Sequence, residues 1–229
     1  VPTAWFSFDL TSDQLTIKLL SNISKFQEYK VRNGEIREAQ MQAIREAAEE
    51  LGKLPIFIDD SATANIMEVR TKARRLQMEH GLGMLVIDYL QLMESRGARN
   101  GSSDNRTQEV AEITRGLKSI ARELNIPVIA LSQLSRSVEL QKPAIPRLAH
   151  LRESGSIEQD ADVVMFIYRK AADKNYRPED LSPEELNLAE IHIAKHRNGP
   201  TGIVKLFFDA ARASFRNLQK RDMGGPPPQ

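Results

Sequence analysis

The sequence predicts an α/β fold, in which a mostly parallel sheet is flanked by helices and an antiparallel hairpin follows near the C-terminal end. Apolar segments that suit strands alternate with amphipathic segments that suit helices over most of the chain. The apolar run at residues 84–87 is continuous and ends at Asp88, which is typical of a parallel strand buried on both faces. Residues 201–209 and 213–218 are separated by a short turn, which indicates an antiparallel hairpin.

The other predicted strands are short apolar segments that end in polar residues. They are residues 4–10, 54–60, 126–133, 162–169 and 190–197. The predicted helices carry apolar residues along one side. The first helix begins near Ser12, and three others cover residues 35–53, 65–80 and 106–125. Thr11 or Ser12 can cap the first of these helices, and Gly81 with Gly83 can end the third. We expect the polar residues 94–107 and 134–151 to form loops.

Composition excludes several classes of protein. The 229 residues suffice for one large domain, and 28% charged with 41% hydrophobic residues is ordinary for a soluble globular protein. The sequence has no apolar run near the roughly 18 residues that a membrane span requires, and no signal peptide. Cysteine is absent, which excludes disulfides and thiolate metal sites and agrees with a cytoplasmic location.

The net charge of +1 means that any contact with nucleic acid must depend on local basic residues. One such segment is 132–152, where four basic residues outnumber a single acidic one, Glu139. The basic residues are Arg136, Lys142, Arg147 and Arg152. Solvated charges on a loop are the alternative interpretation of this segment.

Polar residues at strand ends point to a nucleotide site. Asp88 ends its strand, and ligands of open parallel sheets bind at the carboxyl edge of the strands. In nucleotide hydrolases an Asp at this place holds the Mg²⁺ of the bound nucleotide. Other predicted strands end in Asp, in Ser-Gln or in Lys-x-Arg, which also favours a nucleotide hydrolase. The alternative is a buried strand whose Asp caps the next turn.

One part of a nucleotide hydrolase is missing from these residues. A phosphate-binding loop has the pattern Gly-x-x-x-x-Gly-Lys-Ser/Thr, and no stretch fits it. The only Gly-Lys pair, Gly52-Lys53, is followed by Leu54 and closes a helix. Because the sequence opens on a strand already under way, we expect the coding sequence to extend upstream. We also expect that the 229 residues alone do not hydrolyse ATP at a useful rate.

Five stretches together resemble the bacterial replicative DNA helicases of the DnaB family. They are residues 85–93 (LVIDYLQLM), 104–107 (DNRT), 131–136 (LSQLSR), 151–162 (LRESGSIEQDAD) and 195–200 (KHRNGP). The resemblance runs from Val1 to about Arg216, and its most specific part is residues 151–162. It implies a RecA-like motor domain of a homo-hexameric ring that unwinds DNA with ATP and Mg²⁺, and it implies single-stranded DNA, primase and a helicase loader as partners.

The same resemblance sets the expected domain limits. Residues 1–221 would form a partial RecA-like domain, and the family's N-terminal helical domain and phosphate-binding loop would precede Val1. Residues 222–229 are rich in Gly and Pro, and we expect this tail to be disordered.

The resemblance also assigns roles to individual residues. Asp88 would hold Mg²⁺, and Gln133 would sense the γ-phosphate. Lys195 and Arg197 would reach the nucleotide of a neighbouring subunit, with Arg197 as the arginine finger. Asp9 falls where the family usually has the Glu that activates the attacking water. Asp is one methylene shorter than Glu, and an error near 1 Å in the position of the carboxylate can cost on the order of a hundredfold in rate.

The resemblance also implies a channel loop that touches the DNA backbone and includes Arg152, Glu153 and Gly155. For each of these residues a plainer interpretation exists, because Glu153 can form an ion pair with Arg152 and Gly155 can serve a turn. The four histidines have no metal-ligand spacing, and we interpret them as structural or surface residues: His80, His150, His192 and His196.

The nucleotide-site residues also have plainer interpretations. Asp9 can cap the helix near Ser12, Gln133 can be a turn residue, and Arg197 can pair with Glu190 or face solvent. Two other functions remain open at this stage. One is another RecA-like ATPase, against which residues 152–162 argue. The other is a non-enzymatic ring or scaffold component, which Asp9 and the missing loop favour.

Overall fold

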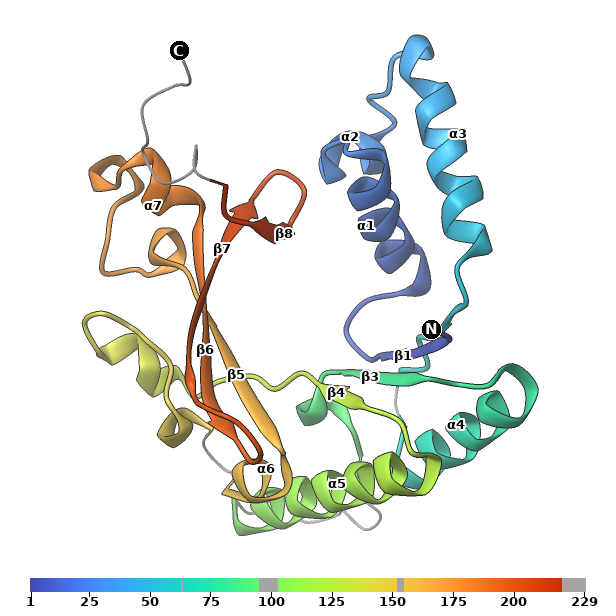
Figure 1. Cartoon of the computed structure of the whole chain (residues 1–229), viewed down its shortest axis with the longest axis vertical. Helices are drawn as coiled ribbons and strands as arrows, with labels where there is room; N and C mark the ends of the chain where they lie inside the picture. Colours follow the sequence, from blue (N-terminus) through green and yellow to red (C-terminus); the bar gives the residue numbers. More distant parts are fainter. Residues whose placement is uncertain (63, 95–102, 152–154, 220–229) are drawn as a thin grey trace. The chain divides into compact units, whose positions relative to one another are not determined.

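The computed structural model describes residues 1–62, 64–94, 103–151 and 155–219, and the chain divides into two compact units (Figure 1). The described part of the first unit is residues 1–62, 64–94, 103–133 and 155–161, and that of the second is residues 134–151 and 162–219. Each unit contains its own four-stranded sheet. The single partial domain expected over residues 1–221 stays a prediction, and the expected disordered tail, residues 222–229, lies outside the described residues.

The sheet of the first unit is entirely parallel, where the sequence predicts a mostly parallel one. Its strands lie in the order β2-β1-β3-β4 and have the bounds Thr3–Ser7 (β1), Ile56–Asp59 (β2), Met84–Asp88 (β3) and Val128–Ala130 (β4). The apolar run before Asp88 forms β3, which pairs on both sides with parallel strands. The strand expected over residues 126–133 is shorter, because its ladder with β3 covers only Val128–Ala130.

Helices surround this sheet. Two of them, α4 (Ile66–His80) and α5 (Ser103–Leu124), pack together along one face, and the short α6 (Gly155–Asp160) packs on α5 (Figure 1). On the opposite side α1 (Ser12–Ser24) packs against α3 (Glu38–Lys53).

The helix boundaries follow local capping. The Thr11 side chain caps α1 in a capping box with Gln14, and the Asn65 side chain caps α4. Gly81 ends α4 with a φ of 64°, a backbone conformation that glycine adopts without strain. The helix expected over residues 35–53 begins at Glu38, and a separate helix, α2 (Glu28–Asn33), precedes it. The six residues of α2 are too few to show helical periodicity, so the sequence pattern does not predict this helix.

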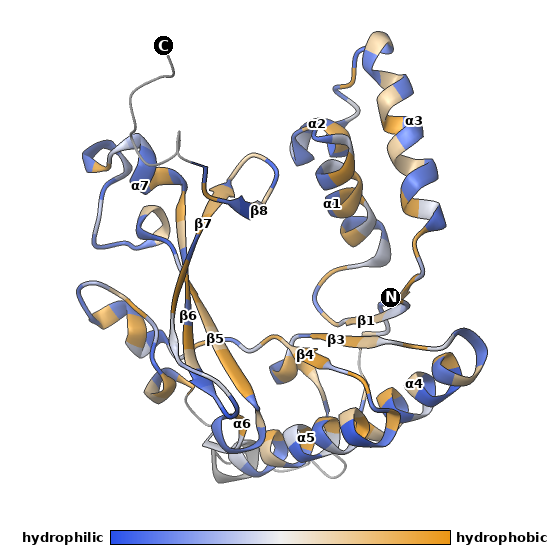
Figure 2. Cartoon of the chain, viewed as in Figure 1, coloured by the Kyte–Doolittle hydropathy of each residue, from blue (hydrophilic) through white to orange (hydrophobic). Residues whose placement is uncertain are grey.

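The core of the first unit lies between the sheet and the α4–α5 pair (Figure 2). Aliphatic side chains of β3, α4 and α5 are almost fully buried there: Leu85, Ile87, Val69, Ala73, Val110, Ile113 and Ile120. Each larger aliphatic side chain stabilises the fold by roughly 1.5–3 kcal/mol when it leaves water. This core fixes the position of β3 and therefore of Asp88 at its end.

The sheet of the second unit is entirely antiparallel. Its strands are Val163–Tyr168 (β5), Leu188–His196 (β6), Gly202–Asp209 (β7) and Ser214–Asn217 (β8), in sequential order. The predicted hairpin is confirmed as β7–β8, and β5 and β6 extend it into a four-stranded sheet. The excursion between β5 and β6 carries the short helix α7 (Pro183–Asn187).

Among the described residues, the longest helices are too short or too polar for a membrane span.

Candidate functional site

Several polar side chains gather at the carboxyl edge of the parallel sheet. Asp59 ends β2, Asp88 ends β3, Asp9 comes two residues after β1, and Gln133 comes three residues after β4. Ser7 pairs with Asp88 in the sheet, and the Phe8 backbone N–H donates to the Asp88 carbonyl at 2.8 Å. Parallel strands therefore place these groups along one edge, which is where open α/β sheets bind ligands.

The Asp88 carboxylate carries an uncompensated charge. Partial burial and, secondly, the negative charge of Asp9 raise the pKa of Asp88. Within the part of the chain that the structure describes, neither carboxylate has a side-chain hydrogen bond or an ion pair. Two like charges held near each other without a counter-ion are unfavourable, so this edge is suited to a bound cation.

Asp59 lies at the same edge, but the charge of its carboxylate is compensated. Its carboxylate contacts Lys72 of α4 and accepts hydrogen bonds from the Ser61 N–H at 3.1 Å and the Ser61 hydroxyl at 2.6 Å. Burial alone would raise the pKa of Asp59, but these hydrogen bonds outweigh burial and lower it. Asp59 is therefore compensated by residues of its own fold, whereas no described contact compensates Asp88.

The possible capping role of Asp9 is wrong. Thr11 caps α1, and the Ser12 N–H donates to the carboxylate of Asp60 at 2.8 Å. The orphan amides of the helix are thus served by other residues, and the exposed side chain of Asp9 has no part in the cap.

Gln133 has a fixed backbone and an exposed side chain. Its N–H donates to Oε1 of Gln91 at 3.1 Å, and Nε2 of Gln91 donates to the Ser132 hydroxyl at 2.9 Å. Among the described residues, the Gln133 side-chain amide has no hydrogen-bond partner. The side chain is thus available to a ligand at the sheet edge while its backbone is held in place.

Lys195 and Arg197 belong to the second unit. Lys195 lies in β6, and Arg197 is the first residue after the end of this strand. The Arg197 N–H donates to the Asp162 carbonyl at 2.8 Å, and Arg197 Nη1 lies 3.3 Å from Oδ1 of Asp162. The alternative pairing with Glu190 is wrong, because Glu190 contacts His192 instead. The Arg197 side chain remains about half exposed, at 45%.

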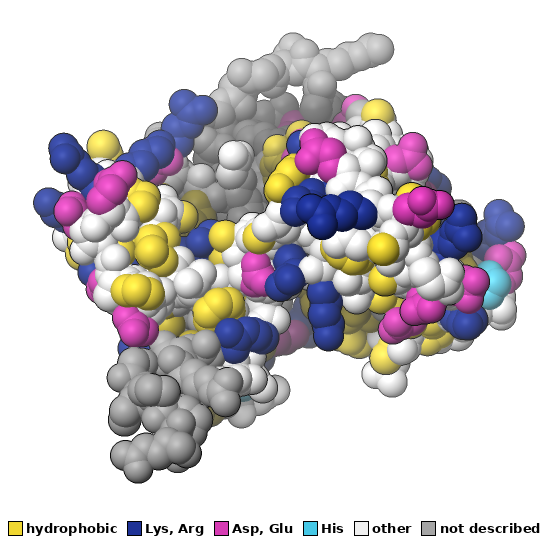
Figure 3. All heavy atoms as spheres, turned by 90° about the horizontal axis from the view of Figure 1, so that it is seen from above, with side chains coloured by type: hydrophobic (Ala, Val, Ile, Leu, Met, Phe, Trp, Pro, Cys, Tyr) yellow, Lys and Arg dark blue, Asp and Glu magenta, His cyan; other side chains and the backbone are white. Residues whose placement is uncertain are grey.

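The expected DNA-contacting residues are only partly described. Arg152 and Glu153 lie outside the described residues, and Gly155 is the exposed first residue of α6. The neighbouring segment 134–151 is folded into two short 3₁₀ turns, Arg136–Leu140 and Leu148–His150, and its Arg136, Lys142 and Arg147 are exposed. On the face drawn in Figure 3, basic and acidic side chains are interspersed.

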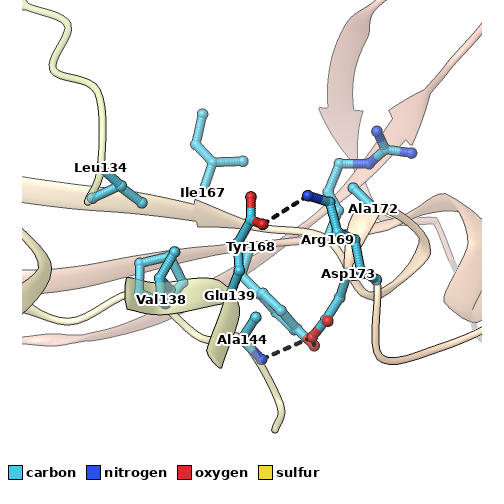
Figure 4. Close-up of a pocket in the computed structure, with 11 residues that line it drawn as sticks. Leu134, Val138, Glu139, Ala144, Ile167, Tyr168, Arg169, Ala172 and Asp173 are labelled. Carbon is cyan, nitrogen blue, oxygen red and sulfur yellow. Dashed lines mark hydrogen bonds and ion pairs between the residues drawn. The ribbon is translucent and has the colours of Figure 1, made fainter. Parts of the chain in front are cut away.

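A buried carboxylate holds this segment in the second unit. Asp173 accepts hydrogen bonds from the Ala144 N–H at 2.8 Å and the Tyr168 hydroxyl at 3.0 Å, beside a small pocket that Val138 also lines (Figure 4). Asn175 supplies two more hydrogen bonds, at 2.9 and 2.8 Å. Burial alone would raise the pKa of Asp173, but these hydrogen bonds lower it.

Three of the histidines make contacts within their own unit. His80 stacks on Phe57, His150 accepts from the Arg147 N–H at 2.9 Å, and His192 contacts Glu190. In the described ranges, no three His, Asp or Glu side chains are grouped as a metal site.

The sequence pattern does not predict the contacts of Gln91 in the first unit, or those of Asp162 and Asp173 in the second unit. Gln133, Arg197 and Ala144, which these three residues contact, are 42, 35 and 29 residues away in the chain, so no local pattern reveals these contacts. Gln91 and Asp162 do lie inside the stretches that resemble a known family, and a polar residue inside such a stretch is the one available signal.

Comparisons with known proteins agree with this geometry. A family model described as "DnaB-like helicase C terminal domain" matches residues 1–217. The chain is 48% identical to the replicative DNA helicase DnaB of Rickettsia typhi over 95% of this chain and 45% of that protein. It is 46% identical to the replicative DNA helicase DnaC of Bacillus subtilis over 98% of this chain and 48% of that protein.

Two solved structures share the fold. One is an ATPase domain, which aligns with a TM-score of 0.84 and 32% identity, over 95% of this chain and 74% of that one. The other is a DnaB-like replicative helicase, solved in a study of its interactions with primase, which aligns with a TM-score of 0.85 and 33% identity, over 95% of this chain and 50% of that one. The chain spans a little under half of the length of the two helicase sequences described above.

Proposed function

Because the chain belongs to the DnaB-like helicase C-terminal domain family, we propose that it is the motor domain of a replicative DNA helicase. In this function a homo-hexameric ring in the cytoplasm couples ATP hydrolysis to movement along single-stranded DNA and to duplex unwinding. These activities are proposed for the full-length product of the gene that encodes these residues. The observation that supports the proposal most directly is the uncompensated Asp88 carboxylate beside Asp9 at the sheet edge.

Asp88 fits the Mg²⁺ that accompanies a nucleotide. Mg²⁺ usually takes one or two carboxylates and completes its shell with water and phosphate oxygens, so a site of three protein ligands is not required. Burial and, secondly, the charge of Asp9 raise the pKa of Asp88, and a divalent cation would offset both. When bound, Mg²⁺ neutralises charge on the phosphates during transfer.

Asp9 and Gln133 have distinct proposed roles at the same edge. Asp9 is the base that orients the attacking water and accepts its proton, with an exposed carboxylate that has room for a water. The exposed side chain of Gln133 contacts the γ-phosphate. Lys195 and Arg197 act on the nucleotide of a neighbouring subunit, where the guanidinium of the half-exposed Arg197 side chain stabilises the transferring phosphoryl group.

The proposed DNA contacts are phosphate contacts. Arg152, with Glu153 and Gly155 through their backbone N–H groups, would bind the backbone of single-stranded DNA without reading its bases. Primase is proposed as a partner because a structurally similar helicase was solved in a study of its interactions with primase. A helicase loader is proposed from family membership alone.

The proposal is tested with the full-length gene product by measuring DNA-stimulated ATP hydrolysis and strand separation. We expect Asp88→Asn to abolish hydrolysis while the ring still assembles. Asp59→Asn is the matched control, since Asp59 ends the neighbouring strand but is compensated by Lys72, and this variant should retain hydrolysis. Equal losses in both variants would show that the edge acts only through its fold.

A non-enzymatic ring component is the second candidate. The observation that favours it is Asp9, which is one methylene shorter than the Glu usual in the family. The same measurement separates the two candidates: a full-length product that assembles into a ring but neither binds nor hydrolyses ATP would support the scaffold and overturn the motor.

A further inference from the structure

The strongest unassigned feature of the sheet edge is the side chain of Gln91. It lies in the 3₁₀ turn Leu90–Leu92 that follows β3, three residues after Asp88. The neighbouring side chains of Leu90 and Met93 are 2% and 1% exposed, so the core anchors this turn on both sides of Gln91. Gln91 therefore extends from a fixed backbone toward the segment that follows β4.

The Gln91 amide continues the ladder between β3 and β4. The backbone part of this ladder ends with the Leu131 N–H on the Ile87 carbonyl at 2.9 Å and the Leu90 N–H on the Leu131 carbonyl at 3.0 Å. Beyond that point the chain after β3 turns away from the segment that follows β4. The Gln91 side chain then makes the next hydrogen bonds to that segment. Its Oε1 accepts from the Gln133 N–H at 3.1 Å, and its Nε2 lies 3.4 Å from the Gln133 carbonyl oxygen.

The chemistry of this pairing requires an amide. Only Gln or Asn presents a donor and an acceptor side by side, as a peptide group does, and Asn is one methylene too short to reach from the same backbone. A Glu could accept from the Gln133 N–H but could not donate to the Ser132 hydroxyl, which Nε2 of Gln91 contacts at 2.9 Å. A Met of similar size offers neither donor nor strong acceptor.

We infer that Gln91 is a positioning residue for ATP hydrolysis, which locks the Gln133 backbone to the strand that carries Asp88. This inference rests on the proposed role of Gln133 at the γ-phosphate. The lock sets the distance between the end of β3 and the Gln133 side chain, so the two groups meet one nucleotide in a fixed geometry. Without the Gln91 hydrogen bonds the Ser132–Gln133 segment can shift. A shift near 1 Å costs on the order of a hundredfold in the rate of hydrolysis.

The test compares steady-state ATP hydrolysis by the full-length gene product and its variants in the presence of single-stranded DNA. We expect Gln91→Met to lower kcat roughly 10- to 100-fold and to change KM for ATP less than about threefold. The preference for a non-hydrolysable ATP analogue over ADP should also fall, because only the triphosphate offers a γ-phosphate. Gln42→Met, a control in α3 that loses a surface hydrogen bond to Glu46, should leave kcat unchanged.

A double-mutant cycle separates this inference from the proposed function. If Gln91 acts through Gln133, the Gln91→Met/Gln133→Ala double variant should be within about twofold of Gln133→Ala alone. Losses that multiply, or a wild-type kcat in Gln91→Met beside a low one in Gln133→Ala, would overturn the inference. A wild-type kcat in Gln133→Ala would instead overturn the proposed role of Gln133.

A milder variant covers the case in which Gln91→Met does not fold. Ser132→Ala removes one acceptor of the Gln91 amide and leaves the backbone pairing in place. We expect a severalfold lower kcat, with no further loss when it is combined with Gln133→Ala. A wild-type kcat in Ser132→Ala, together with an unchanged hydrogen-exchange rate of the Gln133 N–H, would also overturn the inference.

Discussion

Replacing Asp173 tests how the second unit holds the segment 134–151. The carboxylate is only 6% exposed, and it accepts hydrogen bonds from Ala144, Tyr168 and Asn175. Asp173→Ala removes every acceptor at once and leaves these donors in a partly buried place. Asn175 lies two residues from Asp173, so we estimate the main cost from the two donors that come from further away in the chain, the Ala144 N–H and the Tyr168 hydroxyl.

The expected cost follows from those two donors. A buried donor that loses its partner costs about 1–3 kcal/mol, and a hydrogen bond to a charged group is at the upper end of the usual range. We therefore expect Asp173→Ala to lower the free energy of unfolding by about 3–5 kcal/mol. With an m-value of roughly 1–3 kcal/mol/M in urea, the unfolding midpoint should fall by roughly 2 M.

Urea unfolding of the 229-residue chain, followed by circular dichroism, measures this loss, and hydrogen exchange of the Ala144 N–H reports it locally. Asp180→Ala, an exposed carboxylate in the same excursion, is the control and should change stability by less than about 0.5 kcal/mol. An Asp173→Ala chain with an unchanged midpoint and a protected Ala144 amide would refute the reasoning.

The pH dependence of the same variant has a definite sign. The folded pKa of Asp173 is lowered, so its contribution is complete above the unfolded value near 3.9 and is lost as pH falls through the folded pKa. The difference between the wild-type chain and Asp173→Ala should therefore stay constant from about pH 5 to 8 and shrink below about pH 4.

Three further predictions concern the proposed motor. Asp88→Asn should raise the free energy of unfolding at pH 7 by about 1 kcal/mol or less. The matching gain in melting temperature should vanish as pH falls through the raised pKa of Asp88, and a gain that does not depend on pH would contradict this. Full-length Arg197→Ala rings should lose on the order of 10³-fold in hydrolysis, and mixing them with Asp88→Ala subunits should restore activity above either parent if Arg197 acts in trans. Arg152→Ala should flatten the salt dependence of single-stranded DNA binding by roughly 0.7 without changing sequence preference, whereas altered preference with an unchanged slope would exclude a phosphate contact.

The sequence predicts those elements whose cause is local. A continuous apolar run makes β3, a Thr and an Asn at the right places cap α1 and α4, and a short turn between alternating segments makes the β7–β8 hairpin. Each of these follows from neighbouring residues. The short length of β4 does not, because a strand ends where its partner turns away, and that depends on the turn after Asp88.

The site residues divide in the same way. Parallel strands bring Asp9, Asp88 and Gln133 to one edge, and this follows from the predicted order of strands and helices. The contacts that fix their roles are non-local: Gln91 binds Gln133 across two elements, and Asp162 meets Arg197 across the β5–β6 ladder. Such contacts require the register of the sheet, which the sequence pattern alone leaves open.

Asp59 and Asp88 show why the final step needs the structure. Both follow an isoleucine at the end of a parallel strand, and local sequence does not separate them. The difference is Lys72, which α4 brings to Asp59 from 13 residues away. A carboxylate that receives a cation from its own fold is neutralised before any ligand arrives. Within the described residues, Asp88 receives no such cation and has a second negative charge, that of Asp9, nearby. A bound cation can therefore offset the cost of burying the Asp88 carboxylate.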